Sequence, residues 1–233
     1  MGANVVMNWS SGKDAALAYH ILLNSPDHKV THLLTTLSEE HDRIFMHGIR
    51  ESLLDAQAQR MGLPLLKVKL PASPDDTLYR HAMLTALSRL NDEGVTIAAY
   101  GDIFLEDLKA YREQQLAGAS LTGLFPLWKR DTREMIGQIT NAGIEAVIVC
   151  VNDKVLGKEF LGRKIDAALL ADLPDNVDPC GENGEYHTFV YNAPFFSAPI
   201  NIMHGEVVYK GYKSADGDGN WDTGFYFMDV MER

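Results

Sequence analysis

The segment Asn8–Ala15 (Asn-Trp-Ser-Ser-Gly-Lys-Asp-Ala) carries residue types that can hold a chain of phosphates. It lies where a predicted strand ends and a predicted helix begins. A helix start presents unpaired backbone N–H groups and the positive end of the helix dipole, and small residues before it let an anion approach the backbone. Serine hydroxyls and the ammonium group of Lys13 add donors and positive charge. The segment therefore predicts a polyanion site.

This segment also has a simpler explanation, because Ser10 or Ser11 could merely cap an ordinary strand-to-helix turn. The familiar P-loop does not fit. Met7 stands in the place of the first glycine of that motif, and Asp14 follows the lysine where a serine or threonine would bind magnesium. A phosphate site here would be of another type.

A second group of candidate residues surrounds Asp102. Gly101 and Asp102 close a predicted strand, and ligands gather at the carboxyl ends of parallel strands, so Asp102 is expected to face the same crevice as Lys13. Arg112 and Glu113 follow on the next helix, where Arg112 could face an acidic substrate. The alternatives are an N-cap or turn role for Asp102 and a solvated helix face for Arg112 and Glu113.

The block Glu182–His187 brings two carboxylates and an imidazole together on a predicted loop. One of the carboxylates Glu182 and Glu185 could hold ammonium and accept its proton, while the other orients a metal or the substrate. Cys180, just before this block, could be a nucleophile, but no base is evidently paired with it, and we expect it to pack.

Several aromatic and apolar residues could stack on a base or a substrate ring. A role in core or interdomain packing explains them at least as well. These residues are Trp9, Pro126, Leu127 and Trp128.

The elements that must position these residues alternate between strand and helix, which is typical of parallel β-α units. We expect strands at Asn4–Trp9, Val30–Leu37, Leu65–Leu70 and Thr96–Ile103. Amphipathic periodicity predicts helices at Asp14–Asn24, Gly48–Met61, Asp75–Asn91 and Glu106–Leu116.

The pattern changes after the turn-rich segment Gly118–Trp128, and a domain junction is expected there, with domains at 1–125 and 126–233. We predict helices at Asp131–Asn141 and Phe160–Leu173, and strands at Ile144–Val151, Tyr186–Tyr191, Glu206–Tyr212 and Gly224–Met231. Ala215–Asn220 reads as a solvated turn. Phe225–Met231 could pair as an edge strand across a homodimer.

Composition and charge limit the function classes. The net charge of -11 argues against nucleic acid as the main partner. The 2 cysteines fit a reducing compartment and predict a cytoplasmic protein, in which Cys150 is buried in a strand. No apolar run is long enough to cross a bilayer, so we expect no membrane association.

The sequence resembles the pyrophosphatase-loop ATP enzymes, whose signature is Ser-Gly-Gly-x-Asp-Ser, and more narrowly the diphthine–ammonia ligase family. The resemblance rests on blocks in the same order along most of the chain. Besides the first loop they are Gly101-Asp102-Ile103 with Arg112-Glu113, Pro126-Leu127-Trp128, and Cys180-Gly181-Glu182-Asn183-Gly184-Glu185-Tyr186-His187-Thr188.

The resemblance implies a Rossmann-like ATP-binding domain of the adenine nucleotide α-hydrolase type, followed by a smaller α+β substrate domain. It also implies that ATP adenylates a carboxylate, pyrophosphate leaves, and ammonia displaces AMP to give an amide. The loop residues Ser10, Ser11, Gly12, Lys13 and Asp14 would hold the β- and γ-phosphates, with Mg2+ between them.

Other residues take roles from the same resemblance. Thr35 and Thr36 would meet the adenine or ribose, and His47 would contact phosphate, although plain strand-end and structural roles explain them as well. Catalysis would rest on Lys13, Asp102, Glu182 and Glu185. The remaining residues assigned to substrate binding are Arg112, Glu113, Trp128 and His187.

The sequence departs from the family signature in the first loop. Ser11 replaces a glycine and Ala15 replaces the last serine. One hydroxyl that would donate a hydrogen bond to phosphate is therefore missing, and such a bond is worth about 1 kcal/mol. His187 also differs from the residue more usual after Glu-Tyr, which suggests a divergent branch. Two alternative functions stay open: an ATP-binding protein without turnover, and an adenylating RNA-modification enzyme, which the net charge disfavours.

Overall fold

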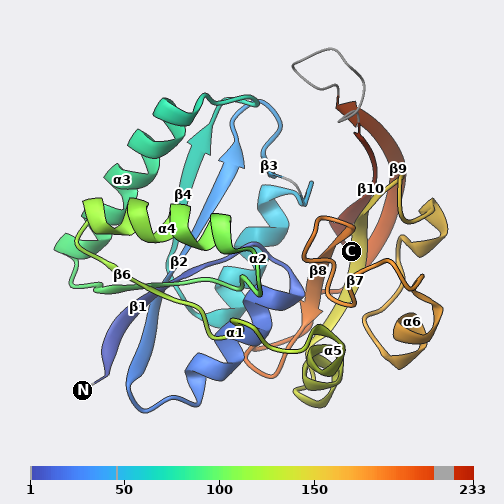
Figure 1. Cartoon of the computed structure of the whole chain (residues 1–233), viewed down its shortest axis with the longest axis horizontal. Coiled ribbons are helices and arrows are strands. Elements are labelled where there is room, and N and C mark those ends of the chain that lie inside the picture. Colours follow the sequence, from blue (N-terminus) through green and yellow to red (C-terminus); the bar gives the residue numbers. More distant parts are fainter. Residues whose placement is uncertain (1, 46, 213–222) are drawn as a thin grey trace.

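The computed structural model describes residues 2–45, 47–212 and 223–233. The predicted α/β class is confirmed, with a mostly parallel sheet and a separate antiparallel sheet toward the C-terminus (Figure 1). The solvated turn predicted at Ala215–Asn220 lies outside the described residues. No described helix has the length and apolar character needed to cross a membrane.

The first sheet is built on parallel pairing of β1 with β2 and β5, of β2 with β4, and of β5 with β6. Only the two-residue strand β3 pairs antiparallel, with the end of β2. The strands are β1 (Ala3–Asn8), β2 (His28–Ser38), β3 (Arg43–Ile44), β4 (Leu65–Leu70), β5 (Ile97–Ala99) and β6 (Thr122–Leu124).

Four helices join these strands: α1 (Lys13–Leu23), α2 (Glu51–Met61), α3 (Asp76–Asp92) and α4 (Glu106–Gly118). Their ends follow from local chemistry. Asp75 caps α3 by accepting a hydrogen bond from the N–H of Leu78 at 2.7 Å, and Gly62 ends α2 in the left-handed region. The N-cap of α1 is Gly12, which has no side chain, and the N–H of Lys13 instead donates to Thr188 Oγ1 at 3.0 Å. The first N–H of α1 is therefore tied to the strand β8 (Tyr186–Asn192).

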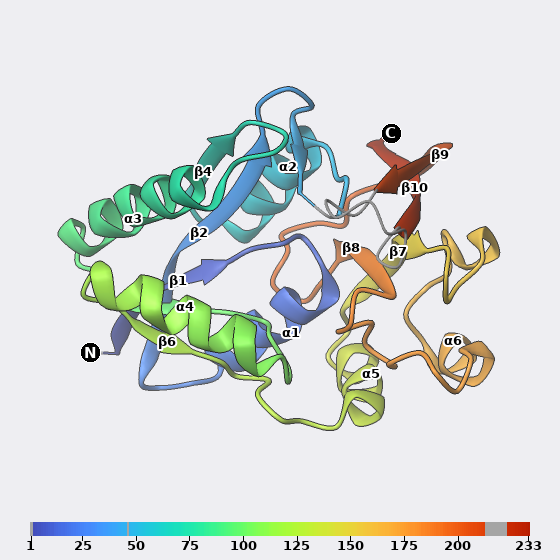
Figure 2. The same ribbon diagram turned by 45° about the horizontal axis from the view of Figure 1, so that its top comes forward.

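The second sheet is antiparallel, in the order β8-β7-β10-β9. Its elements are α5 (Thr132–Asn141), β7 (Glu145–Asn152), the 3-10 turn η1 (Lys158–Phe160), α6 (Ala167–Asp172), β8 (Tyr186–Asn192), β9 (Ile202–Tyr212) and β10 (Thr223–Glu232). Figure 2 shows α5 and α6 beside this sheet, with α5 next to α1 and α6 farther from the first sheet.

Three predicted elements are corrected by the structure. The helix predicted at Phe160–Leu173 is wrong, because Gly162 adopts a φ of 77° and Lys164 forms a β-bridge with Val147, leaving only the short α6. The strand predicted at Thr96–Ile103 is shorter, since β5 covers only Ile97–Ala99. The edge position predicted for Phe225–Met231 is also wrong.

The strand β10 lies inside the sheet, where β7 and β9 pair with its two sides. Because β7 pairs with Phe225–Phe227 and β9 pairs along most of β10, the start of β10 is not an edge, and the outer strands of this sheet are β8 and β9. The sequence pattern also missed β3 and β6, because strands of 2 and 3 residues are too short to show an alternation.

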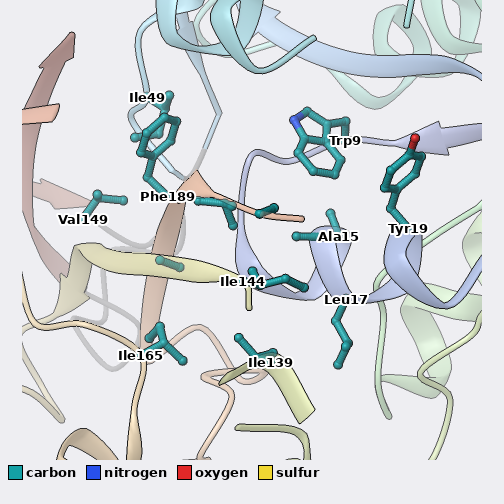
Figure 3. Packing of buried hydrophobic residues seen from close by; sticks show 14 of the residues in the cluster. Trp9, Ala15, Leu17, Tyr19, Ile49, Ile139, Ile144, Val149, Ile165 and Phe189 are labelled. Carbon is teal, nitrogen blue, oxygen red and sulfur yellow. The ribbon is translucent and has the colours of Figure 1, made fainter. Parts of the chain in front are cut away.

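One hydrophobic core joins the two sheets. The same cluster of buried residues contains Trp9 and Leu17 from the first region and Ile144 and Phe189 from the second. Figure 3 shows these side chains packed between α1 and the strands β7 and β8. The loop before α1 is thus held against the second sheet.

Candidate active site

A cavity of about 560 Å³ lies at the carboxyl ends of β1, β2 and β5 and is closed by the loop that leads into β8. Most of the residues singled out from the sequence meet there. They are Ser10, Lys13, Asp14, Thr35, Thr36, His47, Gly101, Asp102, Arg112, Glu182 and His187. Among the described residues, Ser11, Gly12, Glu113, Trp128 and Glu185 lie outside this lining.

The loop between β1 and α1 is strained and held from behind. Ser11 adopts a φ of 70°, which side-chain-bearing residues rarely do, and it is fully buried. Its carbonyl accepts hydrogen bonds from the N–H of Val190 at 2.9 Å and from Gln57 Nε2 at 3.2 Å. Gly101, which follows β5, lets the chain approach the first turn of α1, because a Cβ there would lie 2.8 Å from the N atom of Ala15.

Lys13 provides a buried cation at the start of α1. Its Nζ atom lies 2.8 Å from Asp14 Oδ2 and also donates to the carbonyl of Cys180. Burial alone would lower the pKa of Lys13, but the Asp14 carboxylate together with Tyr186 and Cys180 outweighs burial, and the pKa is raised. Lys13 therefore stays an ammonium ion, ready for an anion in the cavity.

Glu182 reaches the cavity from the second region. Its Oε1 atom accepts hydrogen bonds from the N–H groups of Ile103 at 2.7 Å and Phe104 at 3.3 Å. Burial, and to a smaller extent the Asp14 carboxylate, raise the pKa of Glu182 to about 7 against the effect of these bonds. A carboxyl group with such a pKa can exchange a proton at neutral pH.

Glu185 serves the loop rather than the cavity. Its carboxylate accepts hydrogen bonds from the N–H of Asp178 at 3.0 Å and the N–H of Asn183 at 2.9 Å. It also accepts from Asn183 Nδ2 at 3.0 Å. These bonds shape the turn that presents Glu182, so the two carboxylates grouped by the sequence have different surroundings.

Two histidines, His47 from the turn after β3 and His187 from β8, form one face of the cavity. The rings of His47 and His187 have centroids 4.6 Å apart, and His47 Nδ1 lies 3.3 Å from the carbonyl of Thr188. Burial lowers the pKa of His47 to about 4, and burial together with His47 lowers the pKa of His187 well below its ordinary value. Both rings are therefore neutral at pH 7.

Asp102 and Arg112 form an ion pair at the cavity wall. Arg112 Nε lies 2.6 Å from Asp102 Oδ2, and the guanidinium lies 4.3 Å from the centroid of the Tyr100 ring. The pair is fixed before any ligand arrives. Arg112 is thus a preoriented cation, and Asp102 holds it in place.

The wall near β2 is more apolar. Leu34, Leu70 and Met83 line this end together with Tyr79. Thr35 and Thr36 lie toward the end of β2, which runs to Ser38. The hydroxyl of Thr35 donates to the carbonyl of Trp9 and so ties β2 to the loop before α1. This end of the cavity can therefore hold an apolar part of a ligand.

The candidate residues outside the lining have other contacts. Glu113 lies on the exposed side of α4, 3.6 Å from Lys109 Nζ. Trp128 packs edge-on against Phe125, with Lys109 Nζ 4.7 Å from its ring centroid. Cys150 and Cys180 are buried free thiols, which confirms that both pack.

Sequence reasoning missed Gln57, which is fully buried behind the loop. Its Oε1 accepts from Trp9 Nε1 at 2.8 Å, and its Nε2 donates to the carbonyl of Val190 at 2.7 Å as well as to Ser11. The sequence pattern could have indicated this residue, because Gln57 is polar and lies on the apolar stripe of α2 that includes Leu53. It joins the loop to β8.

Comparison with known proteins matches both halves of the chain. Residues 3–116 match the diphthamide synthase N-terminal domain, and residues 131–226 match the diphthamide synthase C-terminal domain. A diphthine–ammonia ligase of Danio rerio is 28% identical over 191 residues, covering 73% of each chain. The Homo sapiens protein of that name is 25% identical over 190 residues, covering 73% of this chain and 70% of its own.

A third relative of the same name, from Schizosaccharomyces pombe, is 30% identical over 192 residues, covering 73% of this chain and 30% of its own. The two domain matches follow each other in the order in which the two sheets are built. With the loop at Lys13 and the Glu182 loop facing one cavity, the chain belongs to the diphthine–ammonia ligase family.

Proposed function

We propose that this protein is an ATP-dependent ligase that adenylates a carboxylate and converts it to an amide with ammonia, releasing AMP and pyrophosphate. One observation carries the proposal. A single cavity holds a buried ammonium group at a helix start and, facing it, a carboxyl group whose pKa is about 7. The first suits a polyphosphate and the second suits proton removal from ammonium.

The nucleotide would lie along the cavity from its apolar end to Lys13. The adenine would lie near Leu34 and Met83, and the departing phosphates near Ser10 and Lys13. The backbone N–H groups that follow Lys13 at the start of α1 would add donors there. Neutral His47 and His187 could add donors without the cost of burying more charge.

The first step joins the substrate to AMP. A carboxylate oxygen attacks the α-phosphorus, the bond to the β-phosphate oxygen breaks, and pyrophosphate takes that electron pair. Lys13 stabilises the negative charge that develops on pyrophosphate, and Arg112, fixed by Asp102, can orient the acidic substrate. Positioning and electrostatics supply most of the catalysis.

The second step makes the amide. The nitrogen of ammonia bonds to the acyl carbon, the bond from that carbon to the AMP oxygen breaks, and AMP leaves. The proton lost by nitrogen passes to Glu182, which the N–H groups of Ile103 and Phe104 hold in place. Glu185 supports this geometry through its bonds in the loop.

Magnesium would enter with ATP and neutralise its phosphates. Asp14 Oδ1 is buried and has no hydrogen-bond partner among the described residues, so it offers one oxygen ligand. The described residues contain no group of three His, Cys, Asp or Glu side chains arranged for a metal. Mg2+ is commonly bound by one or two carboxylates plus phosphate oxygens and water, so Asp14 would supply the protein ligand.

An exchange assay tests the proposal. Purified protein is incubated with ATP, labelled pyrophosphate and a panel of carboxylic acids, and label entering ATP is measured. We expect exchange that requires a carboxylic acid, and calorimetric heat on ATP binding that Lys13→Ala removes. Tight ATP binding without exchange would instead support a protein without turnover, and unchanged heat in Lys13→Ala would contradict the assigned phosphate site.

The role of Glu182 is tested separately. Glu182→Gln should keep exchange and lose ammonia-dependent AMP release, because only the amide step needs the base. Glu134→Gln on the exposed side of α5 is the matched control. Equal loss of both steps in Glu182→Gln would contradict the assignment.

A further inference from the structure

A second cavity, of about 350 Å³, adjoins the first. Ile44 and Phe45 line both cavities, so the two share a wall. The far side of the second cavity is formed by the second sheet, through Val208 and Phe227. A molecule that reaches the first cavity from this side meets residues of both regions.

The contact between the two regions at this cavity is close. Gly48 adopts a φ of 68°, and a Cβ there would lie 2.9 Å from Phe227 Cδ1. The glycine therefore lets the ring of Phe227 approach the segment after β3. Phe45, Val208 and Phe227 give the cavity apolar walls.

The charges around the second cavity are positive in excess. Arg43 and Arg50 share the single carboxylate of Asp229, with Arg43 Nη2 2.9 Å from Oδ1 and Arg50 Nε 3.0 Å from the same oxygen. Lys210 also lines the cavity and has no acidic partner among the described residues. In a chain with a net charge of -11, such a place favours an anion.

We propose that the second cavity holds the distal part of the carboxylate substrate, and that this substrate carries a second anionic group on an apolar body. The inference rests on the proposed function. The carboxylate to be activated enters the first cavity past Phe45, the apolar body lies between Phe45 and Phe227, and the second anion meets Lys210. In the proposed function the phosphates of ATP lie at Lys13, which lines the first cavity and not the second, so the second cavity stays free for the substrate.

The test compares acids that differ only in the second anion. The whole protein, saturated with α,β-methylene-ATP, is titrated by calorimetry with the diacids succinate, adipate and suberate and with the matched monoacids butyrate, hexanoate and octanoate. We expect at least one diacid to bind about tenfold more tightly than its monoacid, the effect of one charge-assisted hydrogen bond. Lys210→Met should abolish this difference, because it removes the charge and keeps the apolar stem.

Lys154→Met is the matched control, since Lys154 is exposed and lines neither cavity. It should keep the preference for the diacid. The inference would be overturned if the wild-type protein bound no diacid or showed no preference for a diacid over its monoacid. It would also be overturned if Lys210→Met kept the preference. Weaker ATP binding in Lys210→Met would overturn it too, because the lysine would then serve the nucleotide. ATP titration of the wild-type protein separates these results from failure of the proposed function.

Discussion

Replacing Gln57 by leucine should loosen the loop that holds Lys13. The amide of Gln57 makes hydrogen bonds to Trp9 Nε1 at 2.8 Å, to the Ser11 carbonyl at 3.2 Å and to the Val190 carbonyl at 2.7 Å. Leucine fills a similar volume but takes away the acceptor of the indole N–H and one donor to each carbonyl. The variant thus tests the bonds with little change in packing.

The size of the effect follows from these contacts. Each bond contributes about 1 kcal/mol net, and a buried donor or acceptor left without a partner costs about 1–3 kcal/mol. The Ser11 carbonyl keeps its bond from the N–H of Val190, so the indole N–H carries most of the penalty. We expect the free energy of unfolding to fall by about 3–5 kcal/mol, a large part of the roughly 5–15 kcal/mol of a typical domain.

Urea unfolding followed by circular dichroism measures this change, and calorimetry measures ATP binding. ATP affinity should fall with stability, because the carbonyl of the strained Ser11 loses one of its two supports. Gln114→Leu, on the exposed face of α4, should change the unfolding free energy by less than about 0.5 kcal/mol. A change below about 1 kcal/mol in Gln57→Leu would refute the reasoning.

Three further predictions concern the loop, the base and the contact between the two regions. Ser11→Gly should raise the free energy of unfolding by about 1 kcal/mol in urea titrations. Glycine adopts a φ of 70° without strain, and the change removes a buried hydroxyl that has no partner among the described residues. A loss of stability would contradict this prediction. The rate of the amide step should rise with pH and reach a plateau above about pH 7, because Glu182 accepts a proton only when it is ionised. Single-turnover rates measured across pH test this rise, and Glu182→Gln should not show it. Asp229→Asn should lower stability at pH 7 by about 1–2 kcal/mol, because Arg43 and Arg50 lose their shared carboxylate. Hydrogen bonds from these arginines lower the pKa of Asp229 below 3.8. The stabilisation by ionised Asp229 is therefore fully present above pH 3.8 and is lost as pH falls through the lowered pKa. A stability difference between Asp229→Asn and wild type that persists in acid would refute the ion pair as its cause.

Much of the candidate site could be found from short stretches of sequence. The loop at Lys13 combines a strand end, small residues and a helix start, and each of these is visible in neighbouring residues. Parallel strands bring their carboxyl ends to one edge, which placed Asp102 near Lys13 in advance. The structure places both in the lining of one cavity.

The different roles of Glu182 and Glu185 could not be predicted from short stretches of sequence. The two residues are close in sequence and identical in chemistry. Their difference arises because Glu182 contacts Ile103 from the other region, whereas Glu185 turns back to Asp178 and Asn183 in its own loop. Burial then raises the pKa of Glu182 to about 7.

The sequence by itself determined the alternation of strands and helices, the phosphate-type loop and the family, because these depend on periodicity and on residues adjacent in the chain. Only the tertiary structure decided that Gln57 braces Ser11, that His47 meets His187, and that β10 lies inside its sheet. These features depend on contacts between residues far apart in the chain, which burial and strand pairing set only when the whole core forms.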